Sequence, residues 1–69
     1  MFKSREEVEL IKRLYPVGTK IVVDYMDDPQ AIPSGSIGTV TVVDDIGQIH
    51  CEEFDLALIE GVDKFHTLK

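Results

Sequence analysis

The sequence is poor in cysteine and in long apolar runs, and each shortage excludes a class of protein. Its one cysteine cannot form an internal disulfide, so we expect a cytoplasmic protein rather than a secreted one. No apolar run approaches the roughly 18 residues that a membrane span needs. Glu6, Glu7 and Glu9 interrupt the N-terminal segment with acidic side chains, so we also expect no signal peptide.

The chain is also short. Its 69 residues are about half of a typical domain, and a chain of this size buries only ~60% of the surface that its unfolded form exposes. We therefore expect residues 1–69 to form a single domain with a small core. Such a domain has no room for a large enclosed active site within one subunit.

Basic residues are missing from the middle of the chain. Residues 21–63 hold ten acidic residues and no lysine or arginine, whereas residues 1–20 hold five of the seven basic residues. Nucleic-acid affinity comes largely from Lys and Arg, so this distribution argues against ordinary DNA or RNA binding. The net charge of −6 suits a protein that meets a basic surface on another protein. Acidic residues that merely keep a small protein soluble explain the same charge.

A short helix is predicted over residues 5–14. Ser4 and Glu7 have the spacing of a capping box, and apolar residues then recur at helical intervals. Pro16 ends the helix at about Leu14. A helix of this length is not stable alone, so it must dock its apolar stripe on another element.

Five short strands follow, separated by glycine and proline turns. We predict strands at residues 20–26, 37–43, 48–52, 56–59 and 64–68. Gly38 indicates a bulge or a tight bend in the second strand. Alternation in the third strand places Ile49 and Cys51 on the inner face. The predicted fold is mostly β: a small, strongly bent antiparallel barrel of about five strands over 18–68, preceded by one short N-terminal α-helix.

Stretches covering nearly the whole chain resemble family 4314 of the domains of unknown function. They are Tyr15–Thr19, Met26–Pro29, Gly38–Val40, Val43–His50 and Leu56–Phe65, of which the second and fourth are the more specific. The resemblance implies an SH3-like barrel from bacteria, their phages or other mobile elements, and a phage-encoded copy would work in the host cytoplasm. It implies no activity. The chain departs from the family at 52–55, where members carry a Trp-Asp-Asn-Gly type turn in a loop that helps to build the usual ligand groove.

Two acidic pairs can offer oxygen ligands to Ca²⁺ or Mg²⁺. They are Asp27 with Asp28 and Asp44 with Asp45. Neither pair has the alternating spacing of a calcium loop, and Asp is also a common turn former because its side chain bonds nearby backbone N–H groups. We therefore favour turn chemistry and predict no metal site.

His50 and Cys51 are neighbours in a predicted strand. Adjacent strand residues point to opposite faces, so these two side chains cannot work as a nucleophile and its base. We expect Cys51 to fill the core and His50 to be exposed. His50 and His66 together would supply too few ligands for a structural zinc site. The sequence thus predicts no catalytic residue, no cofactor and no enzyme.

An exposed aromatic ringed by carboxylates would make a protein-binding hot spot, and Phe54 is the candidate for one. The alternative is that Phe54 folds inward as a hairpin anchor. Met26 is a second candidate, because methionine adapts to varied partners. The full set of predicted partner-binding residues is Met26, Asp27, Asp28, Asp44, Asp45, Glu52, Glu53, Phe54 and Asp55.

Three functions follow from these patterns. The first is a non-enzymatic acidic interaction module, a phage or mobile-element protein that binds and inhibits a host protein such as a defence factor or a nuclease. The second is a homo-oligomer that sequesters a small nucleotide-like molecule between subunits. The third is a nucleic-acid-binding SH3-like barrel that uses the basic helix, through Lys3, Arg5, Lys12 and Arg13.

Overall fold

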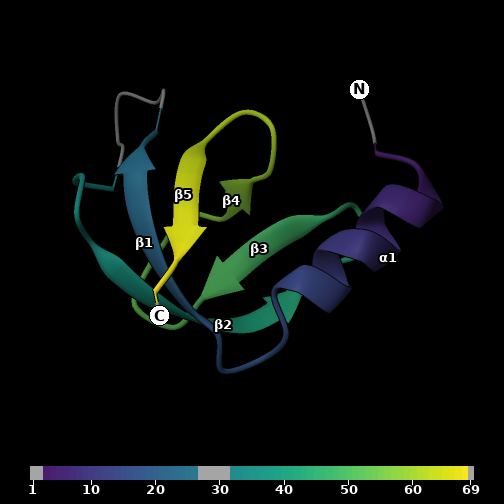
Figure 1. The fold of residues 1–69 in the computed structure, drawn as a ribbon, viewed down its shortest axis with the longest axis horizontal. Coiled ribbons are helices and arrows are strands. Elements are labelled where there is room, and N and C mark those ends of the chain that lie inside the picture. Colours follow the sequence, from purple (N-terminus) through teal and green to yellow (C-terminus); the bar gives the residue numbers. More distant parts are fainter. Residues whose placement is uncertain (1–2, 27–31, 69) are drawn as a thin grey trace.

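The protein is a bent five-stranded antiparallel sheet with one helix at its end (Figure 1). The computed structural model describes residues 3–26 and 32–68. The elements are α1 (Arg5–Leu14), β1 (Lys20–Tyr25), β2 (Ile37–Val43), β3 (Gln48–Cys51), β4 (Leu58–Ile59) and β5 (Lys64–Thr67). The predicted mostly β fold, with one N-terminal helix and five strands, is confirmed. The fourth strand is shorter than predicted, because only 58–59 of the expected 56–59 are extended and paired.

Helix α1 begins and ends where its sequence signals predict. Ser4 Oγ accepts a hydrogen bond from the backbone N–H of Glu7 at 3.1 Å, and the Glu7 carboxylate accepts one from the backbone N–H of Ser4 at 3.0 Å. The bond from the Ser4 backbone is the main reason that the pKa of Glu7 is lowered. The helix ends at Leu14, two residues before Pro16.

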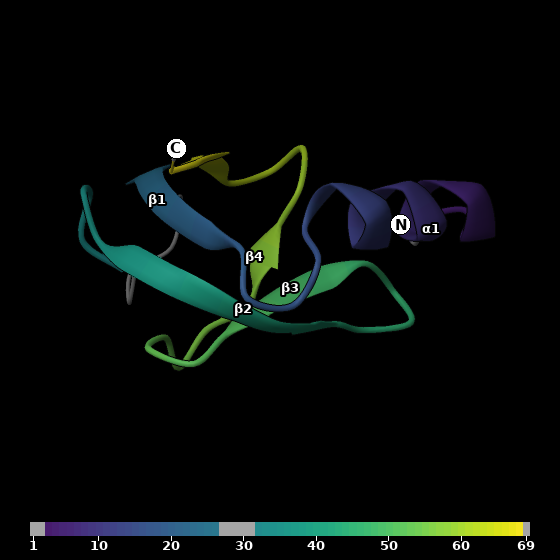
Figure 2. The same ribbon diagram turned by 60° about the horizontal axis from the view of Figure 1, so that its bottom comes forward.

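The sheet bends on β2. The strands lie in the order β4-β3-β2-β1-β5, and each neighbouring pair is antiparallel. Residues 37–39 of β2 pair with β1, whereas residues 40–43 pair with β3. The register against β3 shifts between Val40 and Val42, and a shift of this kind bends and twists a strand. As a result, β1 lies along one half of β2 and β3 along the other half (Figure 2).

Gly38 makes room for a side chain and is not the predicted bulge. The irregularity in β2 lies further along the strand, at residues 40–42. A Cβ built on Gly38 would lie 2.5 Å from Cε2 of Phe54 and 2.9 Å from Cβ of Cys51, well inside van der Waals contact. Glycine at this position therefore allows the Phe54 ring to close against β2.

The core lies inside the bend of the sheet, and α1 covers one end of it. The most deeply buried side chains are Ile21, Ile49, Leu58, Val23 and Val40. Cys51 is buried with Ile49, as the alternation in the third strand predicts. Helix α1 adds Val8 and Ile11, which pack on the turn between β2 and β3: a Cβ on Gly47 would lie 3.4 Å from both side chains. Gly47 also has a φ of 85°, the conformation that the turn required.

Candidate functional site

The predicted partner-binding residues lie in two groups at opposite ends of β3. Asp44 and Asp45 form the turn before this strand, on the side where α1 packs, and residues 52–55 form the loop after it. Met26 is only 8% exposed, because its side chain belongs to the hydrophobic core. The candidates that fall outside the described residues are Asp27 and Asp28. The described candidates therefore do not make one acidic face.

Asp44 organises the turn in which it lies. Its Oδ1 accepts hydrogen bonds from the backbone N–H groups of Ile46 (3.2 Å) and Gln48 (2.8 Å), and its Oδ2 lies 2.8 Å from Nε2 of His50. Burial by itself would raise the pKa of Asp44, but the bond with His50 and the two backbone bonds outweigh it and lower the pKa. Asp44 thus has the turn role that the sequence favoured. Within 3–26 and 32–68, no group of three or more His, Cys, Asp or Glu side chains is placed to hold a metal.

Glu53 and Phe54 hold the loop after β3 against the sheet. The two carboxylate oxygens of Glu53 accept hydrogen bonds from the backbone N–H (2.6 Å) and the hydroxyl (2.9 Å) of Thr39. The backbone bond is the main cause of the lowered pKa of Glu53. Phe54 is half-buried and packs against the core, so it is a loop anchor and not a free-standing exposed aromatic. Glu52 and Asp55, on either side, are exposed.

A groove beside this loop combines apolar walls with carboxylates. One hollow, of about 310 Å³, is lined by Ile32, Pro33, Ser36, Glu53, Phe54, Asp55 and Leu56. A second hollow, of about 340 Å³, is lined by Met26, Gln48, Asp55, Leu56, Ala57, Ile59, Val62 and Asp63. The two share Asp55 and Leu56, and we call them together the acidic groove. None of these lining residues is a lysine or an arginine.

Most of the groove could not be found by sequence reasoning. The sequence singled out Glu53, Phe54 and Asp55 because an aromatic stands between acidic residues there. It did not single out Pro33 or Leu56, which are far apart along the chain. Pro33 had only the pattern of a loop, and Leu56 only that of a strand. Asp63, which the sequence also did not single out, is the only buried charged residue among the described residues.

The two histidines are each paired with an aspartate. His50, expected to be exposed, is half-buried because its ring lies against Asp44, and His66 Nδ1 lies 2.7 Å from Oδ2 of Asp24. Cys51 is buried on the other face of β3 from His50, and this burial raises the pKa of its thiol. The predicted separation of these neighbours is confirmed, and the Cys51 thiol is held in its neutral, unreactive form.

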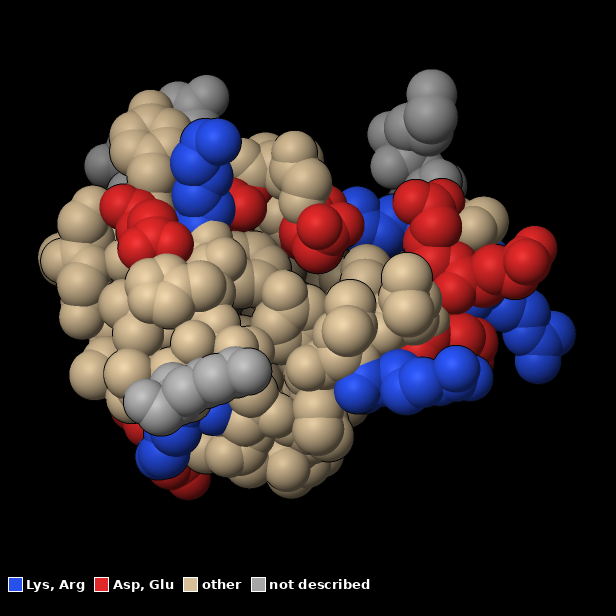
Figure 3. Space-filling model, in the orientation of Figure 1, with Lys and Arg blue, Asp and Glu red and all other residues tan. Residues whose placement is uncertain are grey.

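Three of the four basic residues named for nucleic-acid binding, Lys3, Arg5 and Lys12, line one hollow, but the acidic residues Glu9 and Asp45 line it with them. Lys3 Nζ donates a hydrogen bond to the backbone oxygen of Glu60 at 2.7 Å, and Lys12 Nζ lies 3.6 Å from Oδ1 of Asp45. The remaining two, Arg5 and Arg13, line a hollow with acidic residues of the helix. Basic and acidic side chains consequently alternate along α1, as the space-filling view shows (Figure 3).

Comparison with known proteins gives one match. The model of the family described as "Domain of unknown function (DUF4314)" matches residues 4–68. No curated protein and no solved structure matches the chain. The family description names no fold, so the SH3-like assignment stays a prediction. No helix within the described ranges is long and apolar enough to cross a membrane.

Proposed function

The chain belongs to the DUF4314 family, and we propose that it is a non-enzymatic protein-interaction module whose acidic groove binds a basic segment of another protein. The observation that carries this proposal is the composition of the groove. Its apolar lining includes Phe54 and Leu56, its carboxylates include Glu53 and Asp55, and no basic side chain lines it.

The chemistry of the lining suggests which segment would bind. Phe54 and Leu56 are only partly buried, so an apolar side chain or the stem of an arginine can cover them. An arginine over the Phe54 ring would add a cation–π contact. The Asp55 carboxylate, which is exposed at the junction of the two hollows, can then pair with a second basic residue. A segment that alternates basic and apolar residues fits both requirements.

The charge distribution of the chain also supports a basic protein as the partner. All ten acidic residues of 21–63 lie in a stretch without lysine or arginine, and the net charge of the chain is −6. Such a field attracts a basic partner and speeds association, most strongly at low salt. In the phage or mobile-element setting that the family resemblance implies, the partner we propose is a host protein with a basic surface, such as a defence factor or a nuclease that the module inhibits.

The test is a titration with a synthetic peptide that alternates Arg and Leu, followed by NMR shifts of the backbone amides. We expect the largest shifts at residues 32–36 and 53–57 and an affinity that weakens as salt rises. Asp55→Lys should weaken binding at least about tenfold, since it replaces an attraction at the groove by a repulsion.

Asp45→Lys is the matched control. It changes the net charge by the same amount on a side chain that is also exposed, but at the opposite end of β3. If both variants weakened binding equally, the peptide would be responding to overall charge and the groove would not be its site. Shifts that cluster on α1 instead would also contradict the proposal.

A further inference from the structure

We propose that the outer face of α1 pairs two copies of this chain as an antiparallel dimer. The helix has a second pair of large apolar side chains besides those that it buries. Val8 and Ile11 are 4% and 3% exposed, whereas Leu10 and Leu14 are 53% and 55% exposed. Leu10 and Leu14 are four residues apart and so lie on the same side of the helix, away from the sheet.

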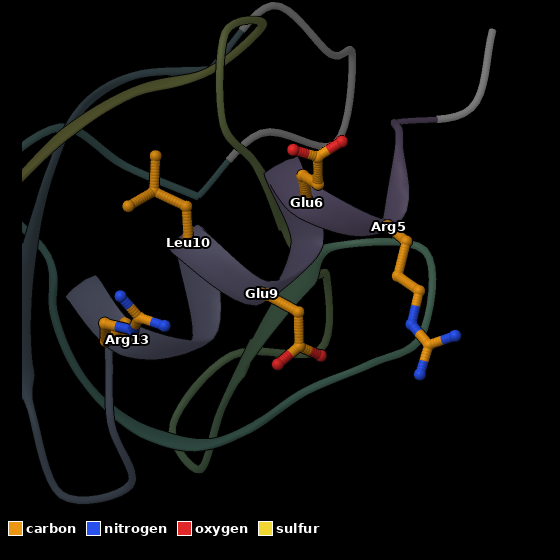
Figure 4. A pocket seen from close by; sticks show the side chains of 5 residues that line it. All are labelled: Arg5, Glu6, Glu9, Leu10 and Arg13. Carbon is orange, nitrogen blue, oxygen red and sulfur yellow. The ribbon is translucent and has the colours of Figure 1, made fainter.

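Charged side chains stand beside these leucines. A hollow on the outer face of α1 is lined by Arg5, Glu6, Glu9, Leu10 and Arg13. Leu10 points to one side of the helix and Glu9 to the other (Figure 4). Glu9 and Arg13 have the i, i+4 spacing that favours an ion pair, yet they form none, and both side chains are available to a neighbour.

The spacing of these residues allows α1 of a second copy to pair with this helix in the antiparallel direction. With a two-fold axis level with residue 11, Glu9 of one copy lies level with Arg13 of the other, because each is two residues from that point. The same axis brings Leu10 and Leu14 of the two copies together on the other flank. A parallel pair would set Leu10 and Leu14 of one copy against Glu9 and Arg13 of the other. The antiparallel arrangement instead sets leucine against leucine and Glu9 against Arg13, so it is the favoured one.

The position of the helix permits this approach. Helix α1 forms one end of the molecule in both ribbon views, so a second copy can lie along it without meeting the sheet (Figures 1 and 2). A helix of ten residues is only about 15 Å long, so the contact is smaller than the ~800 Å² per partner of a standard interface. The expected dimer is therefore weak and forms only at high protein concentration.

Sedimentation equilibrium tests the proposal. The apparent mass of the wild-type protein should rise from the monomer value of 7.8 kDa towards twice that value as its concentration rises to about 1 mM. Leu10→Glu should abolish this rise. Ile37→Glu is the matched control, because Ile37 is 48% exposed at the far end of β2 and should leave the rise unchanged.

Exchanging the charges at positions 9 and 13 distinguishes the antiparallel dimer from other modes of self-association. Glu9→Arg and Arg13→Glu should each weaken self-association at least about tenfold, because each places like charges level with one another. An equimolar mixture of the two variants should regain the dimer, since opposite charges then meet at both positions. Circular dichroism should show that both variants keep the wild-type helix content.

Three results would overturn the proposal. They are a wild-type protein that stays monomeric at about 1 mM, a dimer that survives Leu10→Glu, and a mixture of the charge variants that stays monomeric. The proposal goes beyond the function proposed above and does not depend on it, because the acidic groove and the outer face of α1 share no residue.

Discussion

Asp63 and Ile59 hold each other by two reciprocal hydrogen bonds. Oδ2 of Asp63 accepts from the backbone N–H of Ile59 at 2.8 Å, and the backbone N–H of Asp63 donates to the Ile59 carbonyl oxygen at 2.9 Å. Ile59 belongs to β4, which lies beside β3 at one edge of the sheet. Asp63 therefore satisfies backbone groups of this edge strand, which makes the edge less open to pairing with another chain. It also fixes the turn that leads into β5.

Removing this carboxylate should destabilise the fold. Asp63→Ala leaves the Ile59 N–H without its acceptor, and we expect it to lower the free energy of unfolding by about 1–3 kcal/mol. Asp63→Asn keeps an acceptor oxygen and should cost less. Urea unfolding measures both, with Asp55→Ala as the exposed control that should change stability by less than about 0.5 kcal/mol. Equal losses for Asp63→Ala and Asp55→Ala would show that the buried bond contributes nothing.

The contact between Gly38 and Phe54 should appear as a coupling between two substitutions. Gly38→Ala places a methyl group where the Phe54 ring lies, so the ring and its loop must move, at a cost of about 1–3 kcal/mol. Combined with Phe54→Leu, the same change should cost much less, because the shorter side chain leaves space. A double-mutant cycle by chemical unfolding measures the difference. Additive effects would mean that the ring does not contact this strand in solution.

Stability should fall in acid because three hydrogen-bonded carboxylates have lowered pKa values in the folded protein. The pKa values of Glu7, Asp44 and Glu53 are lowered from ordinary values of 4.5, 3.8 and 4.5. A group with a lowered folded pKa contributes stability that is complete above its unfolded pKa and is lost as the pH falls through its folded pKa. The free energy of unfolding should therefore be constant down to about pH 5 and decline below about pH 4.

Two matched variants test how stability depends on acid. Glu53→Gln should flatten the decline, since it removes one of the three groups. Glu52→Gln is the control, because Glu52 is exposed like Glu53 but does not accept the hydrogen bonds from Thr39. Carboxyl NMR titration of Glu53 checks the cause directly, and a titration at its ordinary value would contradict the role of Thr39.

The helix and the strands could be read from the sequence because their signals are local. The capping box at Ser4 and Glu7 and the stop at Pro16 lie within a few residues of the helix ends they define, and the burial of Ile49 follows from alternation along one strand. The candidate site could be read only in part. An aromatic between acidic residues marked Phe54, but the walls of the groove come from distant segments. Met26, named as a candidate because methionine adapts to varied partners, proved to be buried.

The sequence by itself determined the elements of this protein, the turn at Gly47 and the imbalance of charge, because each depends on the preferences of neighbouring residues. Only the tertiary structure decided where the sheet bends, why position 38 is a glycine and why Asp63 is buried. Those features depend on contacts between residues far apart in the chain, such as Gly38 with Phe54. The bend in β2 brings such segments together, and no local pattern records which of them will meet.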